Sequence, residues 1–161
     1  MKTVIITEGI STLAESTYIF DLYQTKVKAC CGCWSCWLKT PGRCIFNELD
    51  TLYYHYINAE RIIYLAKVKK GFISSELKAF FDRMLPLYLP YISVKTEECM
   101  HVPRYSHYPD VEFYYEEEFE TDREREREVF ENYIKRTFYQ FYSKLIVVKP
   151  LVAYDKVEEV N

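Results

Sequence analysis

Four of the six cysteines fall at spacings that suit a metal cluster. Cys30, Cys33, Cys36 and Cys44 form the pattern C-x2-C-x2-C-x7-C, and two-residue spacers let successive thiolates converge on a single cluster. This spacing favours a four-iron iron–sulfur cluster. Zinc also accepts four thiolates, and a redox disulfide or a packed loop of reduced thiols would explain the same segment. The residues alone leave these alternatives open.

Two further cysteines, Cys31 and Cys99, are spare under the cluster hypothesis. Cys31 stands next to Gly32 in a loop, so it is the better candidate of the two for a reactive thiol. Reactivity of this kind depends on exposure and on a low thiol pKa, which the sequence does not reveal.

The composition limits the class of partner. With 161 residues, 49% of them hydrophobic, the chain is long enough for one domain with a proper core, and we expect a single domain over residues 1–161. The net charge of -3, with both signs scattered along the chain, predicts neither nucleic acid nor a membrane as partner. The first apolar run is shorter than a signal peptide requires, so we expect a cytoplasmic protein.

The elements that must position these thiols alternate between strand and helix patterns. Residues 3–7 form a β-branched run without amphipathic alternation, as in a strand buried on both faces of a sheet. Further strands are predicted at 17–22, 61–66, 111–115 and 145–148. Strands that alternate with helices imply an α/β fold with an open, mostly parallel sheet.

Capping residues indicate where the helices begin. Asp50 is predicted to cap a short helix, and Ser74 or Ser75 to cap a second one that ends before two prolines. Thr121 and Glu124 form a capping box ahead of the longest helix.

Two connections depart from this alternation. Residues 8–16 are too few for the helix that normally joins parallel neighbours. The segment from Pro90 to Pro109 is rich in Tyr, His and Pro and is expected to form a loop.

Two stretches resemble a known family. Residues 30–50, which end in Pro-Gly-Arg-Cys-Ile-Phe-Asn-Glu-Leu-Asp, look like the Cys-rich loop of the NADPH-dependent FMN reductase and iron–sulfur flavoprotein family. Residues 77–88, LKAFFDRMLPLY, are similar to that family's helix after the third strand. Together with the first two strands, the resemblance extends over roughly the first two thirds of the chain.

The resemblance implies a flavodoxin-like sheet of order 2-1-3-4-5 with helices on both faces and the first crossover helix shortened or missing. It also implies an FMN at the carboxyl ends of the strands, with the Cys-rich loop beside it, and electron transfer from NAD(P)H or between carriers. A homodimer or tetramer is the common assembly in this family.

The chain departs from the family where the flavin phosphate would bind. In the family, a helix after the first strand holds the phosphate through backbone N–H groups. Here Ser11 and Thr12 remain as donors, whereas Glu8 and Glu15 would oppose an anion. An ordinary turn without a ligand would also explain these four residues.

The second flavin contact is changed as well. The family's Ser-Pro-Val-Tyr-Phe-Gly aligns with AKVKKG at 66–71, so Lys69 replaces the aromatic residue that would lie against the flavin. Lys67, Lys69 and Lys70, with Gly71, would hold an anionic ligand by charge. A solvated loop explains these lysines equally well.

Two functions follow as hypotheses. The first is an NAD(P)H-dependent FMN oxidoreductase-like flavoprotein or electron-transfer protein, with FMN, an iron–sulfur cluster or both as cofactors and a redox protein as a further partner. The alternative is a degenerate flavodoxin-like protein that has lost FMN and acts as a binding or assembly module. No catalytic residue is assigned. Because a missing helix would leave apolar sheet surface bare, we expect a homo-oligomer.

Overall fold

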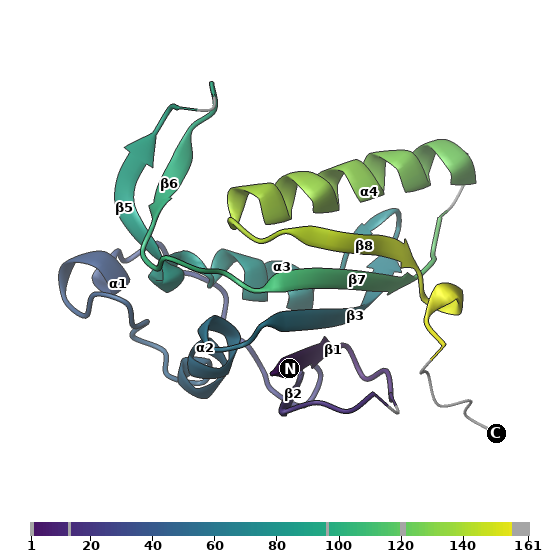
Figure 1. Cartoon of the computed structure of the whole chain (residues 1–161), viewed down its shortest axis with the longest axis horizontal. Coiled ribbons are helices and arrows are strands. Elements are labelled where there is room, and N and C mark those ends of the chain that lie inside the picture. Colours follow the sequence, from purple (N-terminus) through teal and green to yellow (C-terminus); the bar gives the residue numbers. More distant parts are fainter. Residues whose placement is uncertain (1, 13, 96, 120–121, 156–161) are drawn as a thin grey trace.

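A computed structural model describes residues 2–12, 14–95, 97–119 and 122–155. Its main sheet has the order β2-β1-β3-β7-β8, and every pairing along this path is parallel (Figure 1). The strands are β1 (Thr3–Thr7), β2 (Tyr18–Asp21), β3 (Arg61–Lys69), β7 (Asp110–Glu116) and β8 (Leu145–Pro150), and the short β4 (Phe72–Ile73) pairs antiparallel with β3. The α/β class and the strand order 2-1-3-4-5 are therefore confirmed.

The three longer helices pack on one face of this sheet. They are α2 (Asp50–Ile57), α3 (Ser75–Asp82) and α4 (Arg123–Gln140). Their buried residues share one cluster with Ile62 and Tyr64 of β3, and alternate residues of a strand point to the same face. Because the crossovers β2 to β3, β3 to β7 and β7 to β8 all step in one direction, right-handed connections place their helices on the same side.

The opposite face is covered differently from the expectation. Ile5, Ile63 and Leu65 are buried there, between 0% and 3% exposed, against Ile10 of the β1–β2 connection and Tyr154. No helix occurs among the described residues of that connection, as expected, and the 3-10 turn η2 (Leu151–Ala153) leads into Tyr154. Within the described residues, a loop and a turn therefore replace the α-helices predicted for this face.

Helix starts were predicted with mixed success. Ser74 caps α3, since its hydroxyl accepts a hydrogen bond from the Leu77 N–H at 3.0 Å. Asp50 does not cap α2: it is the first helical residue, and Leu49 stands at the cap without a side-chain bond. Leu49 is fully buried, so packing of this leucine rather than a polar cap sets the start of α2.

The longest helix begins at a different cap from the predicted one. Asp122 accepts a hydrogen bond from the Arg125 N–H at 3.2 Å, and its own N–H donates to Glu126 Oε1 at 3.3 Å. Thr121, half of the predicted capping box, lies outside the described residues.

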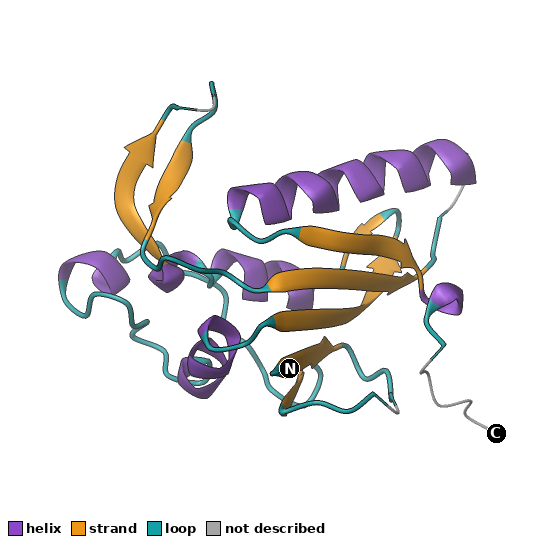
Figure 2. Ribbon diagram, in the orientation of Figure 1, coloured by secondary structure: helices purple, strands orange, loops and turns teal. Residues whose placement is uncertain are grey.

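The segment expected as a loop contains a hairpin. β5 (Tyr88–Ser93) and β6 (Met100–Pro103) pair antiparallel and stand away from the main sheet (Figure 2). Proline is atypical of a strand interior, and for this reason the sequence around Pro90 predicts a loop. Pro90 lies where the register shifts between Tyr88 and Ile92, and irregularities of edge strands are where proline is tolerated.

Candidate functional site

The Cys-rich segment forms a loop, residues 28–48, which we call the Cys loop. It contains the short helix α1 (Ser35–Leu38). Figure 1 shows α1 and the hairpin beyond the end of the sheet where the strands start, whereas the arrowheads point the other way. The loop therefore lies at the amino end of the sheet and not beside the carboxyl ends, where it was expected. The chain reaches this position because residues after Leu22, which is buried, run without helix along the packed face as far as Val27.

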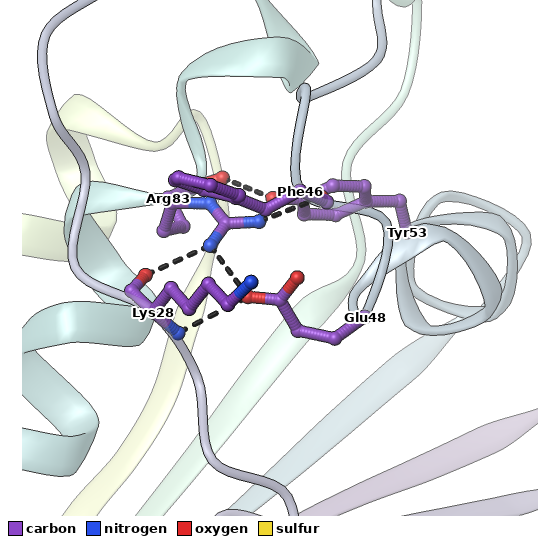
Figure 3. Close-up of polar contacts among 5 residues, drawn as sticks. All are labelled: Lys28, Phe46, Glu48, Tyr53 and Arg83. Carbon is purple, nitrogen blue, oxygen red and sulfur yellow. Dashed lines mark hydrogen bonds and ion pairs between the residues drawn. The ribbon is translucent and has the colours of Figure 1, made fainter.

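The base of the Cys loop is closed by Arg83, which directly follows α3 and is 1% exposed (Figure 3). Its Nη1 donates to the Lys28 carbonyl at 2.8 Å and to Glu48 Oε1 at 2.7 Å, and its Nη2 donates to the Phe46 carbonyl at 2.9 Å. The Lys28 N–H also donates to Glu48 Oε1, at 3.1 Å. One guanidinium thus joins both ends of the loop.

Charge and burial reinforce this closure. Burial tends to raise the pKa of Glu48, but the hydrogen bonds from Arg83 and from backbone N–H groups outweigh it and hold that pKa below its usual value. The hydroxyl of Tyr53 donates to the Arg83 carbonyl, and the Phe46 ring lies 5.2 Å from the guanidinium carbon. A buried cation is tolerated only when it is paired and hydrogen-bonded in this way.

The tip of the loop is held by Trp37. Its Nε1 donates to the carbonyls of Tyr88, at 3.0 Å, and Leu85, at 3.3 Å. Its ring lies 5.0 Å from that of His101 on β6. The Cys loop is therefore fixed at its base by Arg83 and at its tip by Trp37.

The four predicted ligand cysteines all lie on the Cys loop, with Cys36 on α1. Burial raises the pKa of the Cys36 thiol first, and the nearby Cys44, Cys30 and Cys33 raise it further. Cys33 is exposed, and hydrogen bonds involving Ser35 lower its pKa. All six cysteines are free, and among the described residues no group of three or more Cys, His, Asp or Glu is placed to hold a metal ion. The spare Cys31 and Cys99 are both exposed.

A buried carboxylate lies at the other end of the sheet. Glu8 directly follows β1 and is 1% exposed. Its Oε2 accepts a hydrogen bond from the Lys67 N–H of β3 at 2.7 Å, and its Oε1 accepts one from the hydroxyl of Ser74, the cap of α3. Burial raises the pKa of Glu8, although both hydrogen bonds oppose that rise. Glu8 therefore links the ends of β1 and β3 to the start of α3.

The predicted lysine site is a tight turn. Lys70 and Gly71 both have positive φ, 50° and 73°, and connect β3 to β4. Lys69 and Lys70 are exposed, whereas Lys67 Nζ lies 3.7 Å from Glu116 Oε2. These residues serve a hairpin turn and an ion pair.

Ser11 and Thr12 do not gather in the crevice with Glu8. Ser11 is exposed, and the Thr12 hydroxyl hydrogen-bonds to the Tyr154 hydroxyl at 3.2 Å and accepts from the Ala14 N–H at 3.1 Å. Thr12 thus helps to hold Tyr154 on the second face of the sheet.

The residues at the carboxyl ends of β1 and β3 do not fit an FMN phosphate. Both donors that meet there, the Lys67 N–H and the Ser74 hydroxyl, are taken by Glu8. A phosphate in their place would lie against a buried carboxylate, and like charges at short range in a poorly solvated site repel strongly. We therefore derive no chemistry from a flavin at this position.

An apolar cavity of about 900 Å³ lies between the hairpin and the end of α4. Its lining includes Ile92, Met100, Val102, Tyr139 and Tyr142.

The described part of the chain contains no helix with the length and apolar character needed to cross a bilayer.

Comparisons with known proteins support the sequence resemblance. No protein-family profile matches the chain. It is 30% identical over 89 residues to an iron-sulfur flavoprotein of Methanocaldococcus jannaschii, a match that covers 53% of this chain and 45% of that protein. The chain thus spans less than half the length of this relative.

Two solved structures share the fold. The azoreductase AzrA superposes with a TM-score of 0.59 and 9% identity, over 96% of this chain and 89% of that one. The azoreductase from Bacillus anthracis strain Sterne gives a TM-score of 0.58 and 11% identity, over 92% and 87%. The chain therefore has the flavodoxin-like fold and is similar in sequence to an iron-sulfur flavoprotein, as its Cys-rich and α3 segments predict.

Proposed function

We propose that the protein is an electron-transfer protein of the flavoprotein-oxidoreductase type whose redox centre is an iron–sulfur cluster on the Cys loop. The C-x2-C-x2-C-x7-C spacing of Cys30, Cys33, Cys36 and Cys44, on a loop held at its base and tip, carries this proposal. The sequence similarity to an iron-sulfur flavoprotein supports it independently.

The donor set is right in type and number, because four thiolates are the usual ligands of such a cluster. Arg83 and Trp37 hold the loop at base and tip, which leaves the exposed Cys30 and Cys33 free to close on the half-buried Cys36. A cluster, when bound, supplies one-electron transfer. The protein holds the thiols and leaves one side of the loop open to a redox partner.

Reconstitution of the full chain with iron and sulfide, under anaerobic conditions, tests this function. We expect a broad visible absorbance and a paramagnetic signal on reduction in the native protein, and the loss of both in Cys36→Ser. Cys99→Ser is the matched control, since Cys99 is exposed and outside the loop. A colourless native protein, bound zinc in place of iron, or an unchanged Cys36→Ser spectrum would each contradict the proposal.

FMN-dependent oxidoreduction with NAD(P)H is the second candidate. The comparisons favour it, because the relative is named a flavoprotein and the structural neighbours are azoreductases. The buried Glu8 at the carboxyl ends of the strands opposes it. Flavin absorbance bands in the purified protein would favour this candidate over the cluster alone.

The exposed hairpin supports a third candidate, a role in assembly in which the partner is a second copy of this chain. Tyr91, Ile92 and Val94 are exposed by 67%, 54% and 68%, next to the apolar cavity. An isolated two-stranded hairpin is only marginally stable in water, so a partner that covers it would stabilise it. We expect a dimer or tetramer in light scattering after size exclusion, and a monomer would contradict this role.

A further inference from the structure

The environment of Glu8 is unusual for a carboxylate. Acidic side chains are almost never fully buried unless they are paired, and Glu8 is 1% exposed without a salt bridge among the described residues. Its place in the fold is equally specific. The chain goes from β1 to β2 on one side and from β2 to β3 on the other, and open α/β sheets bind ligands at the carboxyl ends of strands where the order switches in this way.

The contacts of Glu8 are those of a bound anion. Both carboxylate oxygens act as acceptors, one from the Lys67 backbone N–H and one from the Ser74 hydroxyl. The Ser74 oxygen itself accepts from the Leu77 N–H, so its proton is directed at Glu8. A backbone N–H and a hydroxyl at the start of a helix are the donors with which proteins hold phosphate groups.

The start of α3 carries a second carboxylate. Glu76 lies in its first turn, accepts from the Ser75 hydroxyl at 2.9 Å, and has a lowered pKa because its own backbone N–H and that hydroxyl bind it. Negative groups are favourable at a helix N-terminus. The positive end of the α3 dipole is therefore already balanced by Glu8 and Glu76. Both carboxylates would repel a phosphate that bound there.

We infer that Glu8 is a built-in anion that fills the crevice between the carboxyl ends of β1 and β3, so that this crevice takes no FMN phosphate while Glu8 is present. Glu8 stands in for a ligand: it satisfies the donors at the ends of β1 and β3 and at the start of α3. The inference concerns the crevice alone and does not depend on the thiols of the Cys loop.

Anion rescue tests this inference. The full chain is compared as native protein, Glu8→Ala, and Glu15→Ala, the control being an exposed carboxylate from the same connection. Melting temperatures are measured in sodium phosphate and in sodium chloride at equal ionic strength. We expect Glu8→Ala to melt lower than the native protein and to regain several degrees in phosphate, because the freed donors accept an external anion. The native protein and Glu15→Ala should show no preference for phosphate over chloride.

A titration of the native protein with FMN, followed by flavin fluorescence, is the second measurement. We expect no saturable quenching that inorganic phosphate can reverse. Saturable FMN binding displaced by phosphate, or a phosphate response of Glu8→Ala no larger than that of the native protein, would overturn the inference. If Glu8→Ala does not fold, the native titration still decides. Cluster loading on the Cys loop is unaffected by either result, so failure here is separable from failure of the proposed function.

Discussion

The two ends of the sheet use buried charge in opposite ways. At the carboxyl end, Glu8 ties β1 and β3 to α3 and fills the crevice where a ligand would bind. At the amino end, Arg83 bonds to residues 28 and 46–48 and so closes the base of the Cys loop, which carries the exposed Cys30 and Cys33. The same helix serves both, since Ser74 caps its start and Arg83 follows its end. A buried charge thus closes a site when it occupies the hydrogen-bond donors there, as Glu8 does, and supports a site when it bonds the backbone of a loop, as Arg83 does.

Removal of Arg83 is expected to have the largest effect. Arg83→Met keeps much of the volume but removes three hydrogen bonds and leaves Glu48 without its cation, so we expect a loss of about 3–5 kcal/mol of unfolding free energy. Urea denaturation measures it, and limited proteolysis should cut the Cys loop faster.

Lys78→Ala is the control for Arg83→Met, because Lys78 forms an exposed ion pair with Asp82 on the same helix. Such surface pairs contribute about 0–1 kcal/mol. If the two variants lost equal amounts of unfolding free energy, Arg83 would contribute no more than a surface ion pair does.

Glu8→Ala is expected to rank second. The truncation removes the acceptor of the Lys67 N–H and of the Ser74 hydroxyl, so two buried donors lose their partner at a cost of about 1–3 kcal/mol. Urea denaturation provides the value, with Glu15→Ala as the exposed control. A native-like midpoint for Glu8→Ala would mean that the crevice needs no internal carboxylate.

Trp37→Phe is expected to have a smaller effect. The ring is kept, but the Nε1 donor to Leu85 and Tyr88 is removed, which costs about 1 kcal/mol. Trp34→Phe, at a side chain that is 60% exposed, should change stability by less than about 0.5 kcal/mol. Indole fluorescence during unfolding reports both, and a larger effect at Trp34 would contradict the tip contact.

The smallest expected effect is a difference in pH response between the two ends. Glu8 has a raised pKa, so its stabilisation is complete below the carboxyl pKa of the unfolded chain and is lost as pH rises through the folded pKa. Glu48 has a lowered pKa, so its stabilisation is present above the unfolded pKa and is lost as pH falls through the folded one. On acidification, the amide protection factor of Lys28, corrected for intrinsic exchange, should therefore fall, whereas the unfolding free energy of the native protein relative to Glu8→Ala should rise. A change of both quantities in the same direction would contradict this difference between the two ends.

Much of the sheet could be predicted from the sequence, because its signals are local. The β-branched run at 3–7 matches β1 at both ends, and Ser74 caps α3 through a contact three residues away. The strand order followed from the family resemblance. The hairpin was missed because Pro90 is acceptable only at the irregularity of an edge strand, which is a property of the pairing.

The two charged anchors could not be predicted because their partners are distant in sequence. Arg83 bonds to Lys28, 55 residues away, and Glu8 bonds to Lys67, 59 residues away. The only signal for Arg83 was its position in the largely apolar LKAFFDRMLPLY stretch. Glu8 was recognised as unfavourable for an anion, but not as the group in its place. The spacing of the thiols was visible, whereas the path that takes them to the amino end was not.

The short cover over the second face has a consequence for engineering. Tyr154, near the far end of the chain, packs on Tyr114 and hydrogen-bonds to Thr12, so the first connection and the last described turn are sealed against each other. A tag or truncation that displaces Tyr154 would therefore unseat the loop after β1 as well and expose Ile5 and Ile63 to solvent. In this protein the stability of the first strand is coupled to the integrity of the turn that holds Tyr154.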